Sequence, residues 1–203
     1  MEFLFVIIIL IMSVVVHEVS HGYAALALGD PTAKYQGRLT LNPFSHLDPI
    51  GSFLIPLIGY MLPGHFIIGW AKPVPFNPYN LKNQKWGEAL VAIAGPLSNI
   101  VLAVIFGLII RFTSFEAFSG QGLSPIGYLV FINITLAIFN LIPIPPLDGS
   151  KILFAVLPYK WQTFRQSFEQ FGLIFVFIFI LFLWQIMSPI INYLFVLLTG
   201  LAF

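Results

Sequence analysis

A long apolar run near the start of the chain, residues 3–28, contains the sequence HEVSH at positions 17–21. About 20 consecutive apolar residues are enough to cross a bilayer as a helix, so the run predicts a membrane helix. Ionisable side chains at membrane depth are costly and usually mark a functional site. Residues four apart lie on one face of a helix. His17 and His21 could therefore bind one zinc ion, with Glu18 beside them as a base toward water.

A purely structural role is the alternative for these three residues. Histidines on a helix can donate hydrogen bonds to backbone carbonyls or to a neighbouring helix, and a glutamate can pair with a cation. A chance occurrence of the motif is uncommon in a chain that has only 4 histidines. The motif supplies two ligands, and a third must come from elsewhere, since catalytic zinc sites usually have three protein ligands.

The composition is that of a membrane protein, with 59% hydrophobic residues, 8% charged residues and a mean hydropathy of +0.95. Soluble domains average about 25% charged residues. Cysteine is absent, which excludes disulfides and cysteine-ligated metal. The net charge is +1 and there is no basic patch, so no nucleic-acid partner is expected.

Further apolar segments predict an all-α polytopic membrane protein with about five to six transmembrane segments. After the first helix, the expected spans are residues 87–112, 123–147, 170–187 and, as a tilted span or an interfacial helix, 189–203. We expect one transmembrane domain over residues 1–203. Its core is expected at 1–157, with peripheral helices at 161–203.

The region between the first and second core helices is expected to contain a small β-hairpin and a re-entrant segment. Residues 32–41 suggest the hairpin, with a turn near Gln36 and Gly37. Residues 50–62 are apolar but too short to span, which is typical of a re-entrant or interfacial segment. A helical substrate must unwind before it is cut, and an exposed strand edge could hold it extended. Residues 32–41 and 66–75 are the candidates for that edge.

Charge predicts how the segments cross the membrane. If the first helix runs from outside to inside, eight of the nine basic residues are cytoplasmic and only Arg111 lies outside, as the positive-inside rule favours. The same threading places the histidine pair and Asp148 in the same half of the bilayer. We therefore expect a multi-pass protein of the cell membrane, with a site inside the bilayer toward the cytoplasm.

Asp148 is the best candidate for the third ligand, with His46, His65 or another carboxylate as alternatives. Three prolines, at positions 143, 145 and 146, precede Asp148 and must unwind the end of the apolar segment. Non-helical backbone at membrane depth is tolerated where protein or a water-filled cavity covers it. The alternative role for Asp148 is an N-cap of the short helix that follows.

Three motifs of the chain together resemble those of the site-2 protease family of intramembrane zinc metalloproteases. They are HEVSH at 17–21, GPLSN at 95–99 and NLIPIPPLDG at 140–149, in the family's order and on three separate spans. The stretches GRLTLNP at 37–43 and GWAKPVP at 69–75 also look like those of small bacterial members. The resemblance covers residues 1–157. The chain has room for neither a PDZ nor a CBS domain, so it is similar to a minimal bacterial-type member.

The resemblance implies that His17, His21 and Asp148 bind one zinc ion per chain. It implies that Glu18 is the catalytic general base, which later protonates the leaving amine. The implied activity is a metalloendopeptidase that hydrolyses peptide bonds within or near transmembrane segments, in regulated intramembrane proteolysis or in removing membrane-embedded remnants. The implied partners are the lipid bilayer and the transmembrane segment of a membrane-protein substrate, with a homo-oligomer as a further option.

Four other polar residues have roles that the sequence leaves open. Asn140 heads the third motif and Asn99 ends the second, and either could hold the scissile backbone or the oxyanion. The alternative for both is an interhelical hydrogen bond. His46 and Asp48 lie among turn-forming residues, where capping is the default role. Orienting a metal ligand, or gating substrate, is their alternative role.

A non-catalytic zinc-binding membrane protein, such as a transporter or a pseudoprotease, is the rival function. Intramembrane histidines and aspartates also line ion pathways. Transporters often show repeated halves, which this sequence lacks, and a structural metal site has no use for Glu18. A metallopeptidase that cuts near the membrane surface is a third option. The histidine pair, however, precedes the end of its helix by about 11–16 Å of helix rise, which favours cutting inside lipid.

Overall fold

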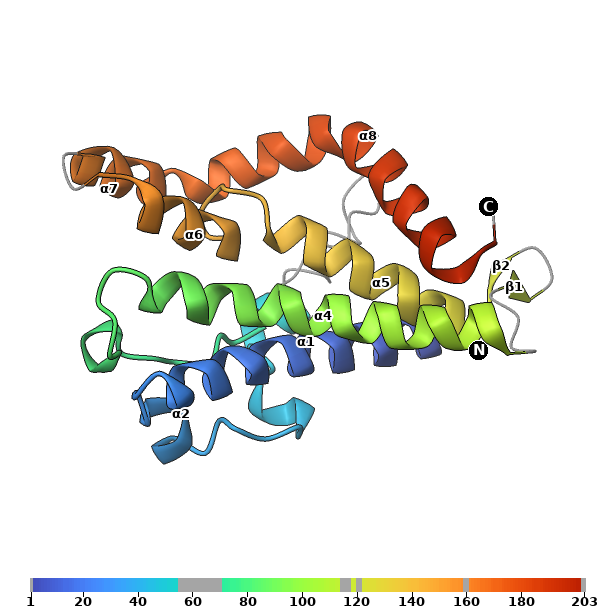
Figure 1. Cartoon of the computed structure of the whole chain (residues 1–203), viewed down its shortest axis with the longest axis horizontal. Coiled ribbons are helices and arrows are strands. Elements are labelled where there is room, and N and C mark those ends of the chain that lie inside the picture. The colour runs from blue at the N-terminus through green and yellow to red at the C-terminus, as the bar shows by residue number, and fades with distance from the viewer. Residues whose placement is uncertain (1, 55–70, 114–117, 120–121, 159–160, 202–203) are drawn as a thin grey trace.

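The chain forms a mostly helical structure, seen in a computed structural model that describes residues 2–54, 71–113, 118–119, 122–158 and 161–201 (Figure 1). The helices are α1 (Glu2–Ala27), α2 (Thr32–Tyr35), α4 (Gly87–Phe112), α5 (Pro125–Asn140), α6 (Asp148–Val156), α7 (Gln162–Gln170) and α8 (Gly172–Thr199). Short helical turns form η1 (Pro43–Ser45), η2 (Pro49–Leu54) and η3 (Pro78–Asn80). Strand β1 (Phe118–Ser119) pairs antiparallel with β2 (Gly122–Leu123). The helical character expected from the sequence is confirmed.

Helix α4 lies at the centre of the packing, with contacts to α1, α5, α6 and α8 (Figure 1). The larger core cluster joins α4, α5 and the C-terminal half of α8, and its most buried members are Val130, Ile191 and Phe195. Helices α1 and α4 run side by side, although they are about 60 residues apart in sequence. This packing places the first and second motifs next to each other.

Two helices are long and apolar enough to cross a membrane, among the residues that the structure describes. They are Leu4–Ala27 and Gly87–Phe112, and both coincide with spans expected from the sequence. Shorter apolar helical stretches occur at Pro125–Asn140 and Gln185–Thr199. The full number of transmembrane segments stays a prediction.

The β-hairpin expected at residues 32–41 is wrong. Residues Thr32–Tyr35 form α2 instead, and residues 36–42 contain no strand. The reason is local, because the Asp30 carboxylate accepts hydrogen bonds from the N–H and the hydroxyl of Thr32 and so forms a turn that leads into α2. Gly37 then turns the chain with a φ of +64°, a conformation that glycine adopts without strain.

The segment expected to re-enter, residues 50–62, lies largely outside the described residues. Its described part belongs to η2, a π-helical turn. Asp48 caps this turn, because its Oδ1 accepts hydrogen bonds from the N–H groups of Ile50 and Gly51. Of the second candidate for a substrate-binding edge, residues 66–75, the structure describes residues 71–75, and these form no strand.

The C-terminal region differs from the two segments expected at 170–187 and 189–203. Helix α7 ends at Gln170, and α8 is one helix of 28 residues with Pro189 inside it. A proline in a helix removes one backbone hydrogen bond and bends the helix without having to end it. Figure 1 shows α8 bent along its length. The helix ends at Gly200, which has a φ of +77°.

The unwinding expected at the third motif is confirmed. Helix α5 ends at Asn140, and α6 begins at Asp148. The seven residues between them contain the three prolines and form turns and bends. Helix α6 then packs against α4, which places Asp148 close to the two helices that carry the first two motifs, α1 and α4.

Asp30 is fully buried just after α1 and ties the end of this helix to a distant segment. Besides its bonds to Thr32, its carboxylate accepts hydrogen bonds from the Asn77 N–H at 2.7 Å and from the Asn80 side chain at 2.8 Å. Burial alone would raise the pKa of a carboxyl group. The hydrogen bonds from Thr32, Asn80 and Asn77 outweigh this and hold the pKa of Asp30 below its ordinary value.

Asp30→Asn should lower the free energy of unfolding by about 2 kcal/mol, since hydrogen bonds to a charged acceptor contribute about 1.5–3 kcal/mol. A carboxylate whose pKa falls on folding stabilises the folded state above its unfolded pKa of about 4, and this stabilisation is lost as the pH falls through the folded pKa. The difference in melting temperature between the two proteins should therefore be complete at pH 7 and shrink below about pH 4. Thermal unfolding in detergent checks this, and equal melting temperatures at pH 7 would contradict it.

Candidate metal centre

His17, His21 and Asp148 come together where α1 meets the start of α6. The two Nε2 atoms of the histidines lie 3.1 Å apart. Asp148 Oδ2 lies 3.1 Å from Nε2 of His17 and 3.2 Å from Nε2 of His21. All three residues are buried, with 5%, 8% and 7% of their surfaces exposed. The structure thus brings together the three residues that the sequence selects as ligands.

Each imidazole is oriented through its other ring nitrogen. Nδ1 of His21 lies 2.8 Å from the Val91 carbonyl oxygen, which can only accept, so Nδ1 carries the proton. Nδ1 of His17 lies 2.6 Å from Asn99 Oδ1. The amide nitrogen of Asn99 donates to two other buried groups, so its Oδ1 is the atom that faces His17 and accepts. In the neutral form of each imidazole, Nε2 is therefore the nitrogen that keeps a lone pair.

When both imidazoles are neutral, three acceptor atoms therefore face one another. Two imidazole lone pairs and a carboxylate oxygen at 3.1–3.2 Å repel one another unless a cation lies among them. A tetrahedron with metal–ligand distances of about 2.0–2.1 Å has edges of about 3.3–3.4 Å, close to these separations. Two neutral imidazoles and one carboxylate are a ligand set of catalytic zinc sites, so these residues fit a zinc ion.

Two glycines leave the space that this arrangement needs. A Cβ atom on Gly95 of α4 would lie 2.5 Å from Nε2 of His21 and 2.6 Å from Cε1 of His17. A Cβ atom on Gly149 would collide with the backbone carbonyl of Leu141 in the unwound segment. A side chain at position 95 would displace the imidazoles, and one at position 149 would push α6 away from that segment.

Asp148 does not cap α6. It is the first residue of the helix, and the N-cap position is taken by Leu147, which makes no side-chain cap hydrogen bond. The second carboxylate oxygen of Asp148 lies 4.0 Å from Nζ of Lys151, one turn along the same helix. Asp148 therefore points one oxygen at the imidazoles and the other at an ammonium group, which offsets part of the cost of burying its charge.

Glu18 directs its carboxylate to a segment far along the chain. Its Oε2 accepts a hydrogen bond from the Val74 N–H at 2.9 Å. Within the described part of the chain, Glu18 takes part in none of the ion pairs. The ion-pair alternative for this residue therefore finds no support in that part.

Asn99 belongs to a buried polar network behind His17. Its Nδ2 donates to Asn133 Oδ1 at 2.8 Å and to the Ser13 carbonyl at 3.3 Å. Asn133 in turn donates to the Ser13 hydroxyl at 2.9 Å. Both asparagines are fully buried, so every bond in this network replaces one to water. The contacts of Asn99 in this structure are those of a residue that orients a histidine.

Asn140, His46 and Asp48 lie outside the group of metal-binding candidates. Asn140 donates to the Leu136 carbonyl of its own helix. His46 is 1% exposed, and its Nε2 lies 2.8 Å from the Thr40 carbonyl. Asp48 caps η2, as described above. Substrate contacts by Asn140 or Asn99 and a gating role for His46 or Asp48 stay predictions.

Sequence reasoning missed Ser13 and Asn133, which complete the network behind His17. Both are polar residues inside apolar runs, and Ser13 lies four residues before His17 on the same helix face, so a signal was present. The Val91 carbonyl was missed for a different reason. Every residue has a carbonyl, and only the packing of α4 against α1 selects this one.

Comparison with known proteins shows a family match over most of the chain. Peptidase family M50 matches residues 5–123 and 116–183. The Bacillus subtilis protein named "Putative zinc metalloprotease YwhC" is 39% identical over 196 residues, which cover 93% of this chain and 83% of that protein. "Putative zinc metalloprotease Rip2" of Mycolicibacterium smegmatis is 33% identical over 175 residues, which cover 86% of this chain and 65% of that protein. The chain thus spans slightly less than two thirds of Rip2. No solved structure matches this chain significantly.

Proposed function

This chain belongs to peptidase family M50, the site-2 protease family, and on that premise we propose that it is a zinc-dependent intramembrane endopeptidase. Its substrates would be peptide bonds within or near transmembrane segments of membrane proteins. The observation that carries the proposal is the convergence of side-chain atoms from His17, His21 and Asp148, with Glu18 next to His17 on α1. The names of the relatives support zinc-dependent proteolysis, and cleavage inside the bilayer goes beyond them.

The residues of the site have distinct roles in this proposal. His17, His21 and Asp148 would hold the zinc ion and leave one coordination position open. When bound, zinc supplies a Lewis acid that polarises the peptide carbonyl and makes water acidic near neutral pH. The Glu18 carboxylate takes a proton from the attacking water and delivers it to the amine of the leaving segment. The C–N bond breaks as the new C–O bond forms, and the products are a carboxyl end and an amine end.

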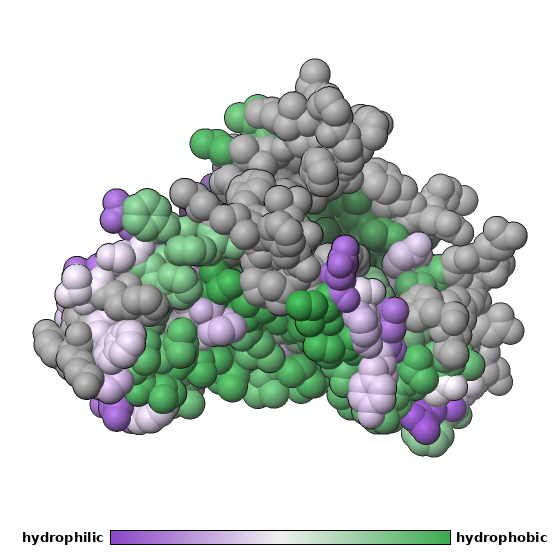
Figure 2. Space-filling model, turned by 90° about the horizontal axis from the view of Figure 1, so that it is seen from above, coloured by the Kyte–Doolittle hydropathy of each residue, from purple (hydrophilic) through white to green (hydrophobic). Residues whose placement is uncertain are grey.

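The exposed apolar surface supports a position inside lipid. In the most apolar 18-residue stretch of each helix, only 28% of α1 and 33% of α4 is buried within the protein. Figure 2 shows apolar side chains across the middle of one face, with hydrophilic side chains mainly to its left and right. Soluble proteins seldom expose so wide an apolar surface, whereas lipid solvates it. His17 and His21 lie about 9–15 Å of helix rise before the end of α1, which supports cutting within the bilayer.

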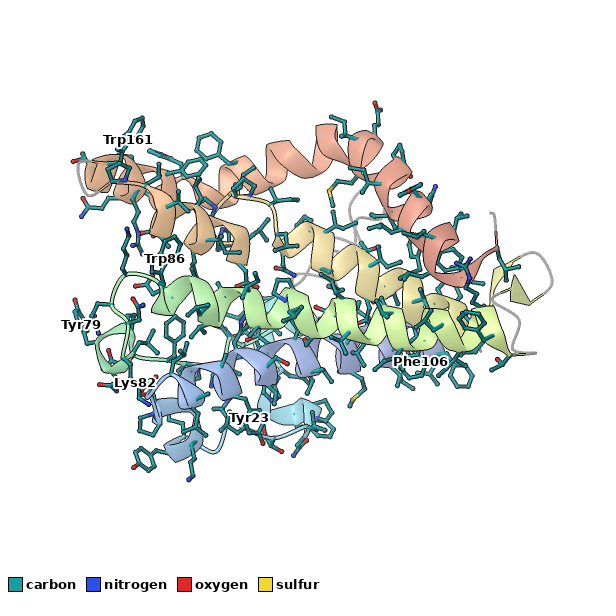
Figure 3. The ribbon with its side chains drawn as sticks, viewed as in Figure 1. Tyr23, Tyr79, Lys82, Trp86, Phe106 and Trp161 are labelled. Atoms are coloured by element: carbon teal, nitrogen blue, oxygen red, sulfur yellow. The ribbon has the colours of Figure 1, made fainter. Side chains whose placement is uncertain are left out.

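The distribution of aromatic and basic residues supports a site toward the cytoplasm. Tyr79, Lys82, Trp86 and Trp161 lie at the same end of the molecule, and Phe106 lies toward the other end of α4 (Figure 3). Tryptophan and tyrosine favour the membrane–water interface, and basic residues favour the cytoplasmic side. The C-terminal end of α1, which is the end nearer the histidine pair, lies at this aromatic and basic end (Figure 1).

A reconstituted cleavage assay tests the proposal. Purified protein in bilayers should hold about one zinc ion per chain and cut a labelled transmembrane test substrate. Mass spectrometry of the fragments should place the cut inside the hydrophobic segment. A zinc chelator should abolish cleavage, and added zinc should restore it, because the three ligands have no other means of activating water.

Two other results would count against the proposal. Stoichiometric zinc without cleavage of a panel of transmembrane substrates would support a non-catalytic zinc-binding membrane protein. Cuts confined to residues outside the hydrophobic segment would support a metallopeptidase that acts at the membrane surface.

A further inference from the structure

We propose that residues 72–75, Lys-Pro-Val-Pro, form a strap in which the Val74 N–H positions the catalytic base Glu18, and that Arg38 holds this strap in place. The inference rests on the proposed function, because it concerns how the base of that reaction is held. The three motifs of the site do not explain the stretches at 37–43 and 69–75. The inference gives a role to Arg38 of the first stretch and to residues 72–75 of the second.

The strap offers Glu18 one backbone donor and no other. Pro73 and Pro75 have no N–H group, so the Val74 N–H is the only one among residues 73–75. It donates to Glu18 Oε2 at 2.9 Å, and Val74 is 6% exposed. Residues that precede proline are restricted to extended conformations, so Lys72 and Val74 both favour an extended strap. The direction of the Val74 N–H is therefore largely set by the sequence of the strap.

The residues around Arg38 clamp the strap at its start. Nη2 of Arg38 donates to the Lys72 carbonyl at 2.9 Å and to the Pro73 carbonyl at 3.3 Å. The Lys72 N–H donates to the His46 carbonyl at 2.8 Å. Arg38 is itself buried, with 8% of its surface exposed, and its N–H is bonded to the Ala33 carbonyl. Both carbonyls that precede the Val74 N–H are thus bonded to one guanidinium group.

Gly22 allows the strap to lie close against α1. It is four residues after Glu18 and lies on the same helix face. A Cβ atom at this position would lie 2.9 Å from Cγ1 of Val74 and 2.5 Å from Cδ2 of Leu39. The approach of Val74 to α1 therefore requires a glycine one turn from the residue that the strap bonds.

The consequence for the reaction is a preorganised base. A glutamate has three rotatable side-chain bonds, and proton transfer needs its carboxylate within hydrogen-bond reach of the reacting water. The bond from Val74 holds Oε2 and leaves Oε1 to exchange the proton. A misplacement of about 1 Å can cost about 100-fold in rate, so a strap that holds the base has a large effect on kcat. Within the described part of the chain, no hydrogen bond joins the strap to the three metal-binding candidates, so zinc binding should be independent of it.

Variants at Val74 test the donor directly. Val74→Pro removes the N–H and should lower kcat by about 10- to 100-fold, with KM and zinc content unchanged. Val74→Ala keeps the N–H and loses only side-chain packing, so its kcat should stay within about twofold of wild type. Rates are to be measured per zinc-loaded chain in the reconstituted cleavage assay.

Variants at Arg38 test the clamp without altering the strap. Arg38→Gln should lower kcat by about 10-fold at unchanged zinc content, and Arg38→Lys should recover part of this loss, because an ammonium group can still donate to the two carbonyls. Arg111→Gln is the matched control. Arg111 also donates to a backbone carbonyl, that of Leu197, but it lies at the far end of α4. Its replacement should leave kcat unchanged.

The results separate this inference from the proposed function. If wild-type protein cleaves its substrate and both Val74→Pro and Arg38→Gln retain the wild-type kcat per zinc-loaded chain, the strap has no role and the inference is overturned. An equal loss of kcat in Arg111→Gln would also overturn it, because the effect would then be general destabilisation. If Val74→Pro does not fold, the Arg38 series decides alone. Failure of the wild-type protein to cleave any substrate would overturn the proposed function itself.

Discussion

Glu18→Gln should abolish proteolysis while leaving the zinc in place. Glutamine has the shape of glutamate and can still accept the Val74 N–H, so the strap and the helix around position 18 should be preserved. It cannot take a proton from water, however. A positioned general base contributes about 10²–10⁴-fold to a rate, so kcat should fall by that factor, or roughly 3–5 kcal/mol in the activation barrier.

Zinc analysis and cleavage kinetics on the same preparation check this result. Glu169→Gln is the matched control, because Glu169 pairs with Arg165 at 2.9 Å on α7 and has no contact with the candidate site. The control should cleave like wild type. Cleavage by zinc-loaded Glu18→Gln protein at more than a tenth of the wild-type rate would show that another group is the base. In cells, membrane-protein fragments that appear with wild type and not with Glu18→Gln would identify the substrates.

Asp148→Asn should lower the affinity for zinc by at least about 100-fold. The substitution removes the only negative charge among the three ligands and replaces an oxygen that lies 3.1 Å and 3.2 Å from the two Nε2 atoms by part of a neutral amide. Mutation of a residue that merely orients a ligand lowers metal affinity by about 10- to 100-fold. Loss of a ligand itself should exceed that range. Lys151, 4.0 Å from Asp148, would also be left with its positive charge uncompensated beside the metal.

Competition with a zinc chelator of known affinity measures this change without relying on activity. Asp30→Asn serves as the control, because it also removes a buried carboxylate but has no contact with the histidines. It should keep the wild-type affinity for zinc while melting at a lower temperature. Wild-type zinc affinity in Asp148→Asn would place the third ligand elsewhere in the chain.

Local sequence signals predicted the long helices and the unwound third motif. Apolar length predicted α1 and α4, and the three prolines before Asp148 predicted the break between α5 and α6. The signals failed where two local preferences competed. Residues 32–41 alternate in a way typical of a strand, yet the Asp30 side chain bonds Thr32 and starts a helical turn. Pro189 suggested a boundary, but the surrounding apolar residues continue α8 through it.

The sequence by itself determined the types of the candidate ligands and their spacing on α1, because residues four apart share a helix face whatever surrounds the helix. It also determined that Val74 carries the only N–H among residues 73–75, since prolines lack one. Only the tertiary structure decided that Asp148 meets both histidines, that Asn99 and the Val91 carbonyl accept from Nδ1 of the imidazoles, and that the strap reaches Glu18. These contacts join residues 56–131 positions apart. They depend on how α1, α4 and α6 pack, and local sequence patterns do not encode the distance between packed elements.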